Sequence, residues 1–410
     1  MNTSLRRVVF LCFGDPDSNM RILRAASAAK EAGYEIYAVG CADQNSGLPK
    51  AKNAAFTRSG VKLVKTDMPP FIWRFRSGLI GALSRVLRFS AAQRLLLQCL
   101  PYHRRYQTCV ADRLKRLDAQ RRLSENDVIF VEHWQAGHAA RLAKMRYGCR
   151  IIYDLSELSV VEFSQNTLWN ALMPKLIQNA EAASVSVADT VLSVTPVAEA
   201  YFKDYYSNKV DYRFVPNLVL KDAQAFKPAP KERAGRVVYI GGIRAHRGLE
   251  GMIEALIYLP PEVQFDCRGY GKPAYLDILT TLADRLGVAE RFHLLPAVAP
   301  DDILDHIAGY SCGLAMLDPA GLQLQLAQPN KVFLYLKARV PFVVSGNTTL
   351  AAQIKTHSFA RAVEWGCAKK LAQEITQVMA LKTKVPAAAY DRFLQEIEAQ
   401  DFNAYFQKTG

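Results

Sequence analysis

Short apolar runs alternate with helical patterns along the chain, and a polar, proline-containing stretch at 221–233 interrupts this alternation once. The runs before the interruption lie at 8–13, 34–39, 61–64, 127–131, 150–153 and 190–194. Those after it lie at 237–240, 264–268, 292–294, 312–316 and 342–345. Strands that alternate with helices form parallel sheets covered on both faces. The sequence therefore predicts an α/β chain of two doubly wound, Rossmann-like domains facing each other across a cleft, where such sheets bind ligands.

The same interruption predicts where the domains divide. We expect an N-terminal domain over residues 1–217, a second domain over 218–385, and a helical C-terminal stretch over 386–410. A length of 410 residues is enough for two domains that each bury a hydrophobic core.

The charge distribution predicts an anionic partner. The net charge is +14, and the segment 70–106 combines seven arginines with aromatic and aliphatic residues and has no acidic residue. Such a segment suits the interface of an anionic membrane. A core-packed helix with a solvated arginine face is the alternative. Nucleic acid is disfavoured because the chain has no helix-turn-helix, zinc-finger or RNA-binding signature.

Cysteine usage and the N-terminus predict a cytoplasmic protein. The eight cysteines are scattered, with no C-x-x-C pair and no Cys/His cluster at ligand spacing, so we expect neither a metal site nor a disulfide framework. The first apolar run is too short and too quickly followed by acidic residues for an export signal. No run is long enough to span a bilayer.

A glycine turn between a strand and a helix predicts a phosphate site. Gly241 and Gly242 let the backbone approach a ligand closely, and the free N–H groups of the following helix attract an anion. Arg244 and Arg247 add forked donors that suit a diphosphate. The alternative is a tight turn whose arginines are only solvated.

Two further segments predict parts of the same site. Gly269-Tyr270-Gly271 ends a strand, and Tyr270 either stacks on a base or closes the turn. Asn330 is expected to cap a helix that starts near Lys331, so that the first-turn N–H groups and the lysine can hold a phosphate.

These segments resemble the donor-binding motifs of GT-B glycosyltransferases of the family-4 type, which are retaining enzymes. The stretch 329–341 resembles P-N-K-x-F-E-Y-x-x-x-G-x-P, the glycine turn resembles Y-x-G-x-x-x-x-x-[KR]-G with Arg247 as its phosphate-binding cation, and 269–271 resembles the G-x-G. The resemblance implies that a nucleotide-sugar donor binds the second domain as a substrate, with no further cofactor. It also implies that the chain end returns to the first domain.

The chain departs from the family at two acidic positions. Leu334 stands where the family usually has a ribose-binding glutamate, and Leu326 stands at the acidic position eight residues earlier. A leucine leaves ribose hydroxyls unpaired. Three explanations stay open: the glutamines Gln323, Gln325 or Gln328 serve the sugar, the donor differs, or the chain no longer catalyses a reaction.

The first domain supplies candidates for chemistry on the acceptor. Glu132 and His133 follow a strand at the place where related enzymes carry a histidine or an acid, and the stretch 153–158 resembles Y-D-x-H-E. Glu132, Glu157 or Asp154 is a candidate general base for an inverting transfer. In a retaining transfer, the departing phosphate takes up the proton of the attacking acceptor hydroxyl. The alternative is that His133 is a structural residue whose hydrogen-bonding groups have partners.

Together these features predict a metal-independent hexosyltransferase that moves a sugar from a nucleotide-sugar donor to a lipid-linked or polysaccharide acceptor. We expect it at the inner face of the cell membrane, as a peripheral protein in bacterial surface polysaccharide biosynthesis. The alternatives are a non-catalytic GT-B scaffold that binds a partner and a nucleotide-sugar epimerase. Nucleotide binding separates the enzymes from the scaffold, and binding to anionic liposomes separates the transferase from a soluble epimerase.

Overall fold

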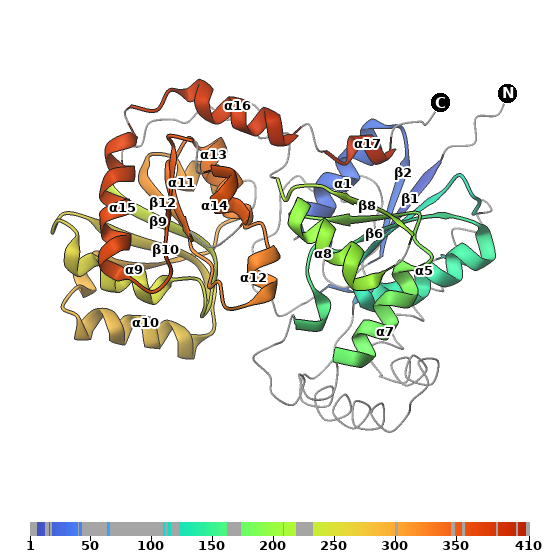
Figure 1. The fold of residues 1–410 in the computed structure, drawn as a ribbon, viewed down its shortest axis with the longest axis horizontal. Helices are drawn as coiled ribbons and strands as arrows, with labels where there is room; N and C mark the ends of the chain where they lie inside the picture. The colour runs from blue at the N-terminus through green and yellow to red at the C-terminus, as the bar shows by residue number, and fades with distance from the viewer. Residues whose placement is uncertain are drawn as a thin grey trace. The chain divides into compact units, whose positions relative to one another are not determined.

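The computed structural model describes residues 6–12, 16, 19–39, 41–42, 64–65, 110, 114–115, 123–161, 174–207, 209–218, 233–299, 302–345, 349–354, 357–382, 384–398 and 401–406. The chain forms two compact units (Figure 1). The first consists of the N-terminal half up to Val215 together with the chain from Phe402 onward, and the second contains Pro216–Asp401. The basic segment 70–106 lies outside the described residues, as does nearly all of the linker at 221–233.

The first unit is built on a six-stranded parallel sheet in the order β2-β1-β5-β6-β7-β8. Its strands are β1 (Arg7–Leu11), β2 (Glu35–Val39), β5 (Val128–Glu132), β6 (Arg150–Asp154), β7 (Thr190–Ser193) and β8 (Asp211–Phe214). Its longer helices are α1 (Met20–Glu31), α5 (Trp134–Tyr147), α7 (Pro174–Val185) and α8 (Pro196–Tyr206). Every residue of β1 and β5 is buried, as expected for central strands of a sheet that is covered on both faces.

The second unit repeats this architecture with the strand order β11-β10-β9-β12-β13-β14, again parallel throughout. The strands are β9 (Arg233–Ile243), β10 (Gln264–Gly271), β11 (Phe292–Pro296), β12 (Tyr310–Ala315), β13 (Phe342–Ser345) and β14 (Ala360–Val363). The helices are α9 (Leu249–Ala255), α10 (Pro273–Arg285), α11 (Ile303–Ile307), α12 (Leu322–Leu326), α13 (Asn330–Lys337), α14 (Thr349–Ile354), α15 (Ala368–Leu381) and α16 (Ala387–Glu398). In Figure 1, α9, α10 and α15 lie together on one side of the sheet and α11 and α13 on the other.

These two sheets confirm the predicted pair of doubly wound, Rossmann-like domains. The C-terminal stretch is shared between the units. Helix α16 packs against α13 in the second unit, whereas α17 (Asn403–Phe406) packs against α1 in the first. Phe402 anchors this last segment, because its ring lies 5.9 Å from the ring of Phe130 and the Arg21 guanidinium lies over it at 5.1 Å.

Helix α13 is fixed to the sheet by one buried tyrosine. The Tyr335 hydroxyl donates to the carbonyl oxygens of Val238 at 3.1 Å and Leu314 at 3.0 Å. A Cβ atom on Gly313 would lie 2.7 Å from the Tyr335 ring, so only glycine permits this approach. The contact holds the N-terminus of α13 beside the carboxyl end of β9.

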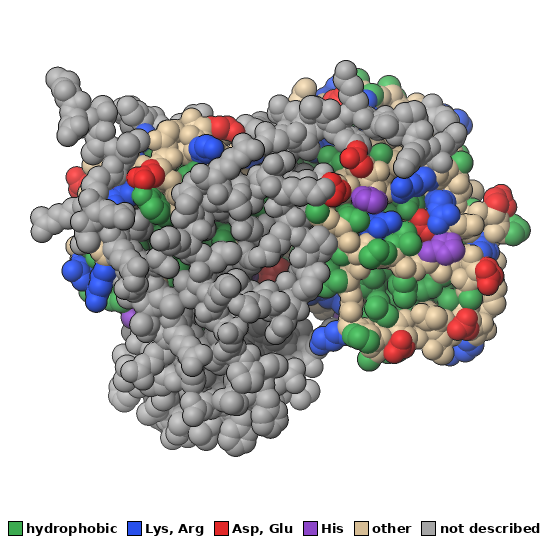
Figure 2. All heavy atoms as spheres, turned by 180° about the vertical axis from the view of Figure 1, so that it is seen from behind, with side chains coloured by type: hydrophobic (Ala, Val, Ile, Leu, Met, Phe, Trp, Pro, Cys, Tyr) green, Lys and Arg blue, Asp and Glu red, His purple; other side chains and the backbone are tan. Residues whose placement is uncertain are grey.

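Within the described residues, no helix is both long enough and apolar enough to span a bilayer. Figure 2 shows the molecule from behind, and basic, acidic and apolar side chains are interspersed over the surface of the second unit that is visible there.

Candidate functional site

In the second unit, the carboxyl ends of β9 and β10 approach each other too closely for side chains. A Cβ atom on Gly269 would lie 1.7 Å from the Gly241 carbonyl oxygen, and one on Gly271 would lie 2.7 Å from the Ile243 carbonyl oxygen. The G-x-G glycines are therefore required by the packing of two neighbouring strand ends, in which Gly241 pairs with Gly269. Tyr270 between them is about half exposed, and both roles predicted for it stay open.

The predicted glycine turn is wrong in position: Gly241 and Gly242 lie at the end of β9, and the turn follows at residues 245–248. Cationic side chains from two segments gather at this end of β9. A Cβ atom on Gly241 would lie 3.9 Å from Lys331 Nζ, and one on Gly242 would lie 3.0 Å from an Arg244 guanidinium nitrogen. The Tyr239 hydroxyl donates to the Gly242 carbonyl oxygen at 2.7 Å and so supports this end of the strand. The structure thus brings together residues that lie about ninety positions apart in the sequence.

The charges in this cluster act on one another. Burial, together with the positive charges of Arg247 and Arg244, lowers the pKa of the Lys331 ammonium group to about 7. Burial raises the pKa of Tyr239, and the same two arginines oppose that shift. A concentration of positive charge that depresses a lysine pKa is the electrostatic condition that favours an anionic ligand. We refer to Arg244, Arg247 and Lys331 as the cation cluster.

The N-terminus of α13 differs from the sequence prediction in one detail. Pro329 is the N-cap, Asn330 is the first helical residue, and no side-chain hydrogen bond caps the helix. The prediction that Asn330 caps this helix is therefore wrong. Asn330 is instead exposed in the first turn, next to Lys331.

The positions that depart from the family pattern are apolar and buried. Leu334 is 8% exposed and Leu326 is 6% exposed. Among the candidate glutamines, Gln325 donates to the Pro319 carbonyl oxygen at 2.5 Å, and Gln328 is buried and accepts from the Asn217 backbone N–H at 3.0 Å. At least these two glutamines have structural partners.

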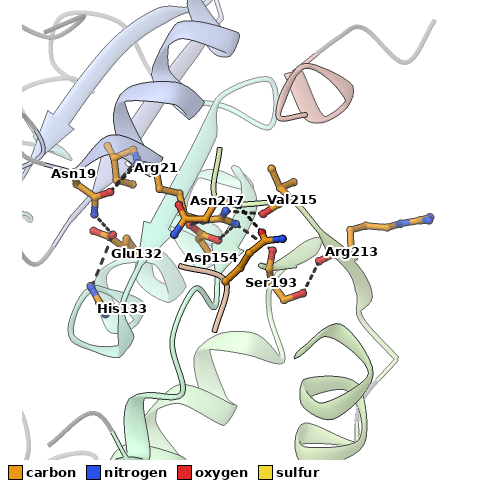
Figure 3. A network of polar contacts seen from close by, with 11 residues as sticks. Asn19, Arg21, Glu132, His133, Asp154, Ser193, Arg213, Val215 and Asn217 are labelled. Carbon is orange, nitrogen blue, oxygen red and sulfur yellow. Dashed lines mark hydrogen bonds and ion pairs between the residues drawn. The ribbon is translucent and has the colours of Figure 1, made fainter. Parts of the chain in front are cut away.

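In the first unit, the predicted Glu132–His133 pair lies at the carboxyl end of β5 (Figure 3). Glu132 is 3% exposed and accepts a hydrogen bond from the Asn19 side-chain amide, while His133 Nε2 lies 3.9 Å from Glu132 Oε1. Asn19 also caps α1, because its side-chain oxygen accepts from the backbone N–H groups of Arg21 and Ile22. This hydrogen-bond chain links the first βα loop to the Glu132 carboxylate.

Glu132 has a buried carboxyl group, and His133 has a strained backbone. Burial raises the pKa of the Glu132 carboxyl, and His133 opposes that shift. His133 has φ 67° and ψ 150°, a backbone conformation that few residues other than glycine adopt. Such strain concentrates at functional sites, so it favours a functional role for His133 over a purely structural one. Glu157 is exposed, and its charge raises the pKa of Glu132 less than burial does.

Asp154 is committed to a structural ion pair. Its two carboxylate oxygens accept from Arg21 Nε at 2.7 Å and Arg21 Nη2 at 2.8 Å, and both side chains are almost fully buried. Arg21 also donates to the carbonyl oxygens of Val215 and Ser193 (Figure 3). A carboxylate held in a buried bidentate pair is a poor general base, so Glu132 is the better candidate of the two.

A further buried carboxylate was not singled out by the sequence. Glu181 of α7 is fully buried and accepts hydrogen bonds from the hydroxyls of Tyr206 at 2.5 Å and Ser159 at 2.8 Å. Burial raises the pKa of this carboxyl. Its partners come from separate elements, and nothing in the local sequence marks it.

Comparisons with known proteins agree with this fold. Residues 18–218 match the glycosyl transferase 4-like domain. Sucrose-phosphate synthase from Thermosynechococcus elongatus is similar over 98% of this chain and 96% of its own, with a TM-score of 0.69 and 14% identity. HepE from Anabaena, solved with UDP, is similar over 98% and 97%, with a TM-score of 0.63 and 14% identity. WaaG, a glycosyltransferase involved in lipopolysaccharide biosynthesis, is similar over 97% of both chains, with a TM-score of 0.63 and 14% identity. No curated protein sequence matches the chain significantly.

The two Rossmann-like domains give the chain the GT-B fold, which it shares with these solved structures. The match of residues 18–218 to the glycosyl transferase 4-like domain covers just under half of the chain.

Proposed function

We propose that the chain transfers a hexose from a nucleotide-sugar donor to a lipid-linked or polysaccharide acceptor. The observation that carries this proposal is the cation cluster of Arg244, Arg247 and Lys331 at the Gly241–Gly242 end of β9. A nucleotide sugar presents a diphosphate, whose oxygens match guanidinium forks and an ammonium group. When the glycosidic bond to the diphosphate breaks, negative charge develops on the phosphate, and prearranged cations stabilise it.

The proteins similar to this chain support the choice of donor and setting. HepE is solved with UDP and with UDP-glucose, and WaaG takes part in lipopolysaccharide biosynthesis. We extend both properties to this chain as part of the proposal. Its basic, aromatic segment 70–106 supports action at the inner face of the cell membrane, where anionic headgroups attract arginines.

Independence from metal ions is also part of the proposal. The cation cluster supplies the positive charge at the diphosphate that a divalent ion supplies in metal-dependent transferases. Donor turnover should therefore persist in the presence of EDTA. Loss of turnover in EDTA and its recovery with Mg²⁺ or Mn²⁺ would contradict this point.

Nucleotide binding tests the proposal directly. We expect one of UDP, GDP, ADP, dTDP or CMP to raise the melting temperature, because a ligand at 100 times its Kd stabilises the folded state by about 2.7 kcal/mol. Arg247→Ala should lose most of that shift. Arg339→Ala is the matched control, since Arg339 is an exposed arginine of the same unit that pairs with Asp391 at 3.1 Å. Equal shifts in the two variants would count against the cation cluster as the donor site.

A non-catalytic scaffold is the second candidate, and the buried Leu334 and Leu326 favour it. A protein that no longer binds a ribose has no need of carboxylates at those positions. No response to any of the five nucleotides would favour the scaffold over the transferase. Binding of the full chain to vesicles with and without anionic lipid then tests the membrane part of the proposal for either candidate.

A further inference from the structure

The turn that carries Arg247 is tied to a second loop of the same unit by one pair of side chains. His246 Nδ1 lies 2.7 Å from Asp318 Oδ2, although the two residues are 72 positions apart. The Asp318 backbone N–H donates to the His246 carbonyl oxygen at 3.2 Å, so the loops are joined by main chain as well as side chain. The other Asp318 oxygen accepts from the Ala320 backbone N–H at 2.9 Å, which fixes the orientation of the carboxylate.

The backbone around Arg247 is held in an unusual conformation. The residues on either side of Arg247 both have positive φ, 64° for His246 and 70° for Gly248. A Cβ atom on Gly248 would lie 2.6 Å from the Met316 Cβ, so the turn packs tightly on the segment that leads to Asp318. A histidine in the left-handed conformation costs free energy, and the contacts with Asp318 compensate for that cost.

We propose that His246 and Asp318 form a latch that positions Arg247 for the donor diphosphate. This inference rests on the proposed function and names two positioning residues for the same site. Without the latch, the turn can leave its strained conformation, and Arg247 must then be ordered when the ligand binds. That ordering weakens binding, because the entropy of fixing a loop and a long side chain is lost at that moment.

The electrostatics of the latch fit this role. The Ala320 N–H and His246 lower the pKa of the Asp318 carboxyl, so Asp318 is a carboxylate at neutral pH. Its side chain is 16% exposed, whereas that of His246 is 49% exposed. The carboxylate is therefore the fixed member of the pair, and the exposed histidine depends on it for its position.

Three substitutions separate the latch from the backbone conformation. His246→Gly keeps the positive φ at no steric cost but removes the side-chain contact. His246→Asn tolerates positive φ and places an amide nitrogen where Nδ1 lies, so it can still donate to Asp318. Asp318→Ala removes the acceptor. Asp391→Ala is the matched control, because it removes another exposed ion pair of this unit.

The experiment is calorimetric titration of each full-length variant with the nucleoside diphosphate that stabilises the wild-type protein. We expect Kd to rise about tenfold in His246→Gly and Asp318→Ala, as for loss of one charge-assisted hydrogen bond. His246→Asn and Asp391→Ala should stay within about threefold of the wild type. Melting temperatures without nucleotide should change no more in the latch variants than in Asp391→Ala.

Two results would overturn the latch. Unchanged Kd in His246→Gly and Asp318→Ala would show that Arg247 needs no such support. A weakened Kd accompanied by a large drop in the melting temperature without nucleotide, and no rescue by His246→Asn, would assign the pair to folding. If the wild type binds no nucleotide while Asp318→Ala keeps its melting temperature, the proposed function itself fails, and the latch with it.

Discussion

The ammonium nitrogen of Lys331 lies 4.8 Å from the centre of the Tyr239 ring. This contact is a cation–π interaction between the first turn of α13 and the end of β9. It places the lysine beside the end of β9, where burial and the positive charges of Arg247 and Arg244 together lower its pKa to about 7. Near neutral pH, the free protein is therefore an equilibrium of charged and uncharged Lys331.

Donor binding should take up a proton at this lysine. A diphosphate favours the ammonium form, so the pKa of Lys331 rises on binding, and affinity is retained below pH 7 and lost as pH rises above it. We expect the Kd for the nucleoside diphosphate to rise by about tenfold or more between pH 7 and pH 9. Calorimetry in buffers of different ionisation enthalpy would measure the uptake.

The control for that experiment is Lys331→Arg, which stays charged throughout this range. Its affinity should be nearly independent of pH from 7 to 9. If the wild type and Lys331→Arg have the same pH dependence, Lys331 is not the group that titrates.

Leu334→Glu tests whether a ribose still binds next to position 334, as the resemblance to the family implies. Without nucleotide, the substitution should lower the free energy of unfolding by several kcal/mol or raise the carboxyl pKa, because Leu334 is 8% exposed and lies in the middle of α13. If a ribose binds beside this position, its hydroxyls hydrogen-bond to the new carboxylate and the nucleotide-induced melting shift becomes larger than in the wild type. Leu334→Gln, which is polar but uncharged, is the matched variant. A smaller shift in both would place the ribose elsewhere.

Glu132→Gln has a pH-dependent effect on stability whose sign follows from burial. The pKa of Glu132 is raised in the folded state, so the stability it contributes is present below the unfolded-state pKa and is lost as pH rises through the folded-state value. The neutral glutamine avoids this loss. We expect Glu132→Gln to raise the melting temperature relative to the wild type more at pH 8 than at pH 5. The exposed Glu157, replaced in the same way, serves as the control.

The fold could be predicted because short stretches of sequence, the apolar runs and the helical patterns between them, indicate its strands and helices. The apolar runs at 237–240 and 312–316 became β9 and β12, whereas the predicted glycine turn at Gly241 and Gly242 is the end of β9. The cation cluster was likewise predicted by residue type, since its glycines, arginines and lysine lie in short motifs. The close approach of Gly269 to Gly241 gives that G-x-G a packing reason that the motif alone does not contain.

The long-range pairs could not be predicted in the same way. Arg21 and Asp154 are 133 positions apart, and His246 and Asp318 are 72 apart. Neither pair lies in a shared motif, and only the order of strands in each sheet brings its members together. For this reason Asp154 was a plausible base in the sequence and is half of a buried ion pair in the structure.

Substitutions of His133 can separate an effect on activity from an effect on stability. Its φ of 67° and ψ of 150° suit glycine, so His133→Gly should leave the free energy of unfolding unchanged or raise it by about 1 kcal/mol. His133→Ala keeps the strain and loses the contact with Glu132, so it should be less stable than His133→Gly. If the histidine acts on the acceptor, both variants lose most of their transfer activity while nucleotide affinity is unchanged. Full activity in His133→Gly would show that the strained histidine has no part in the reaction.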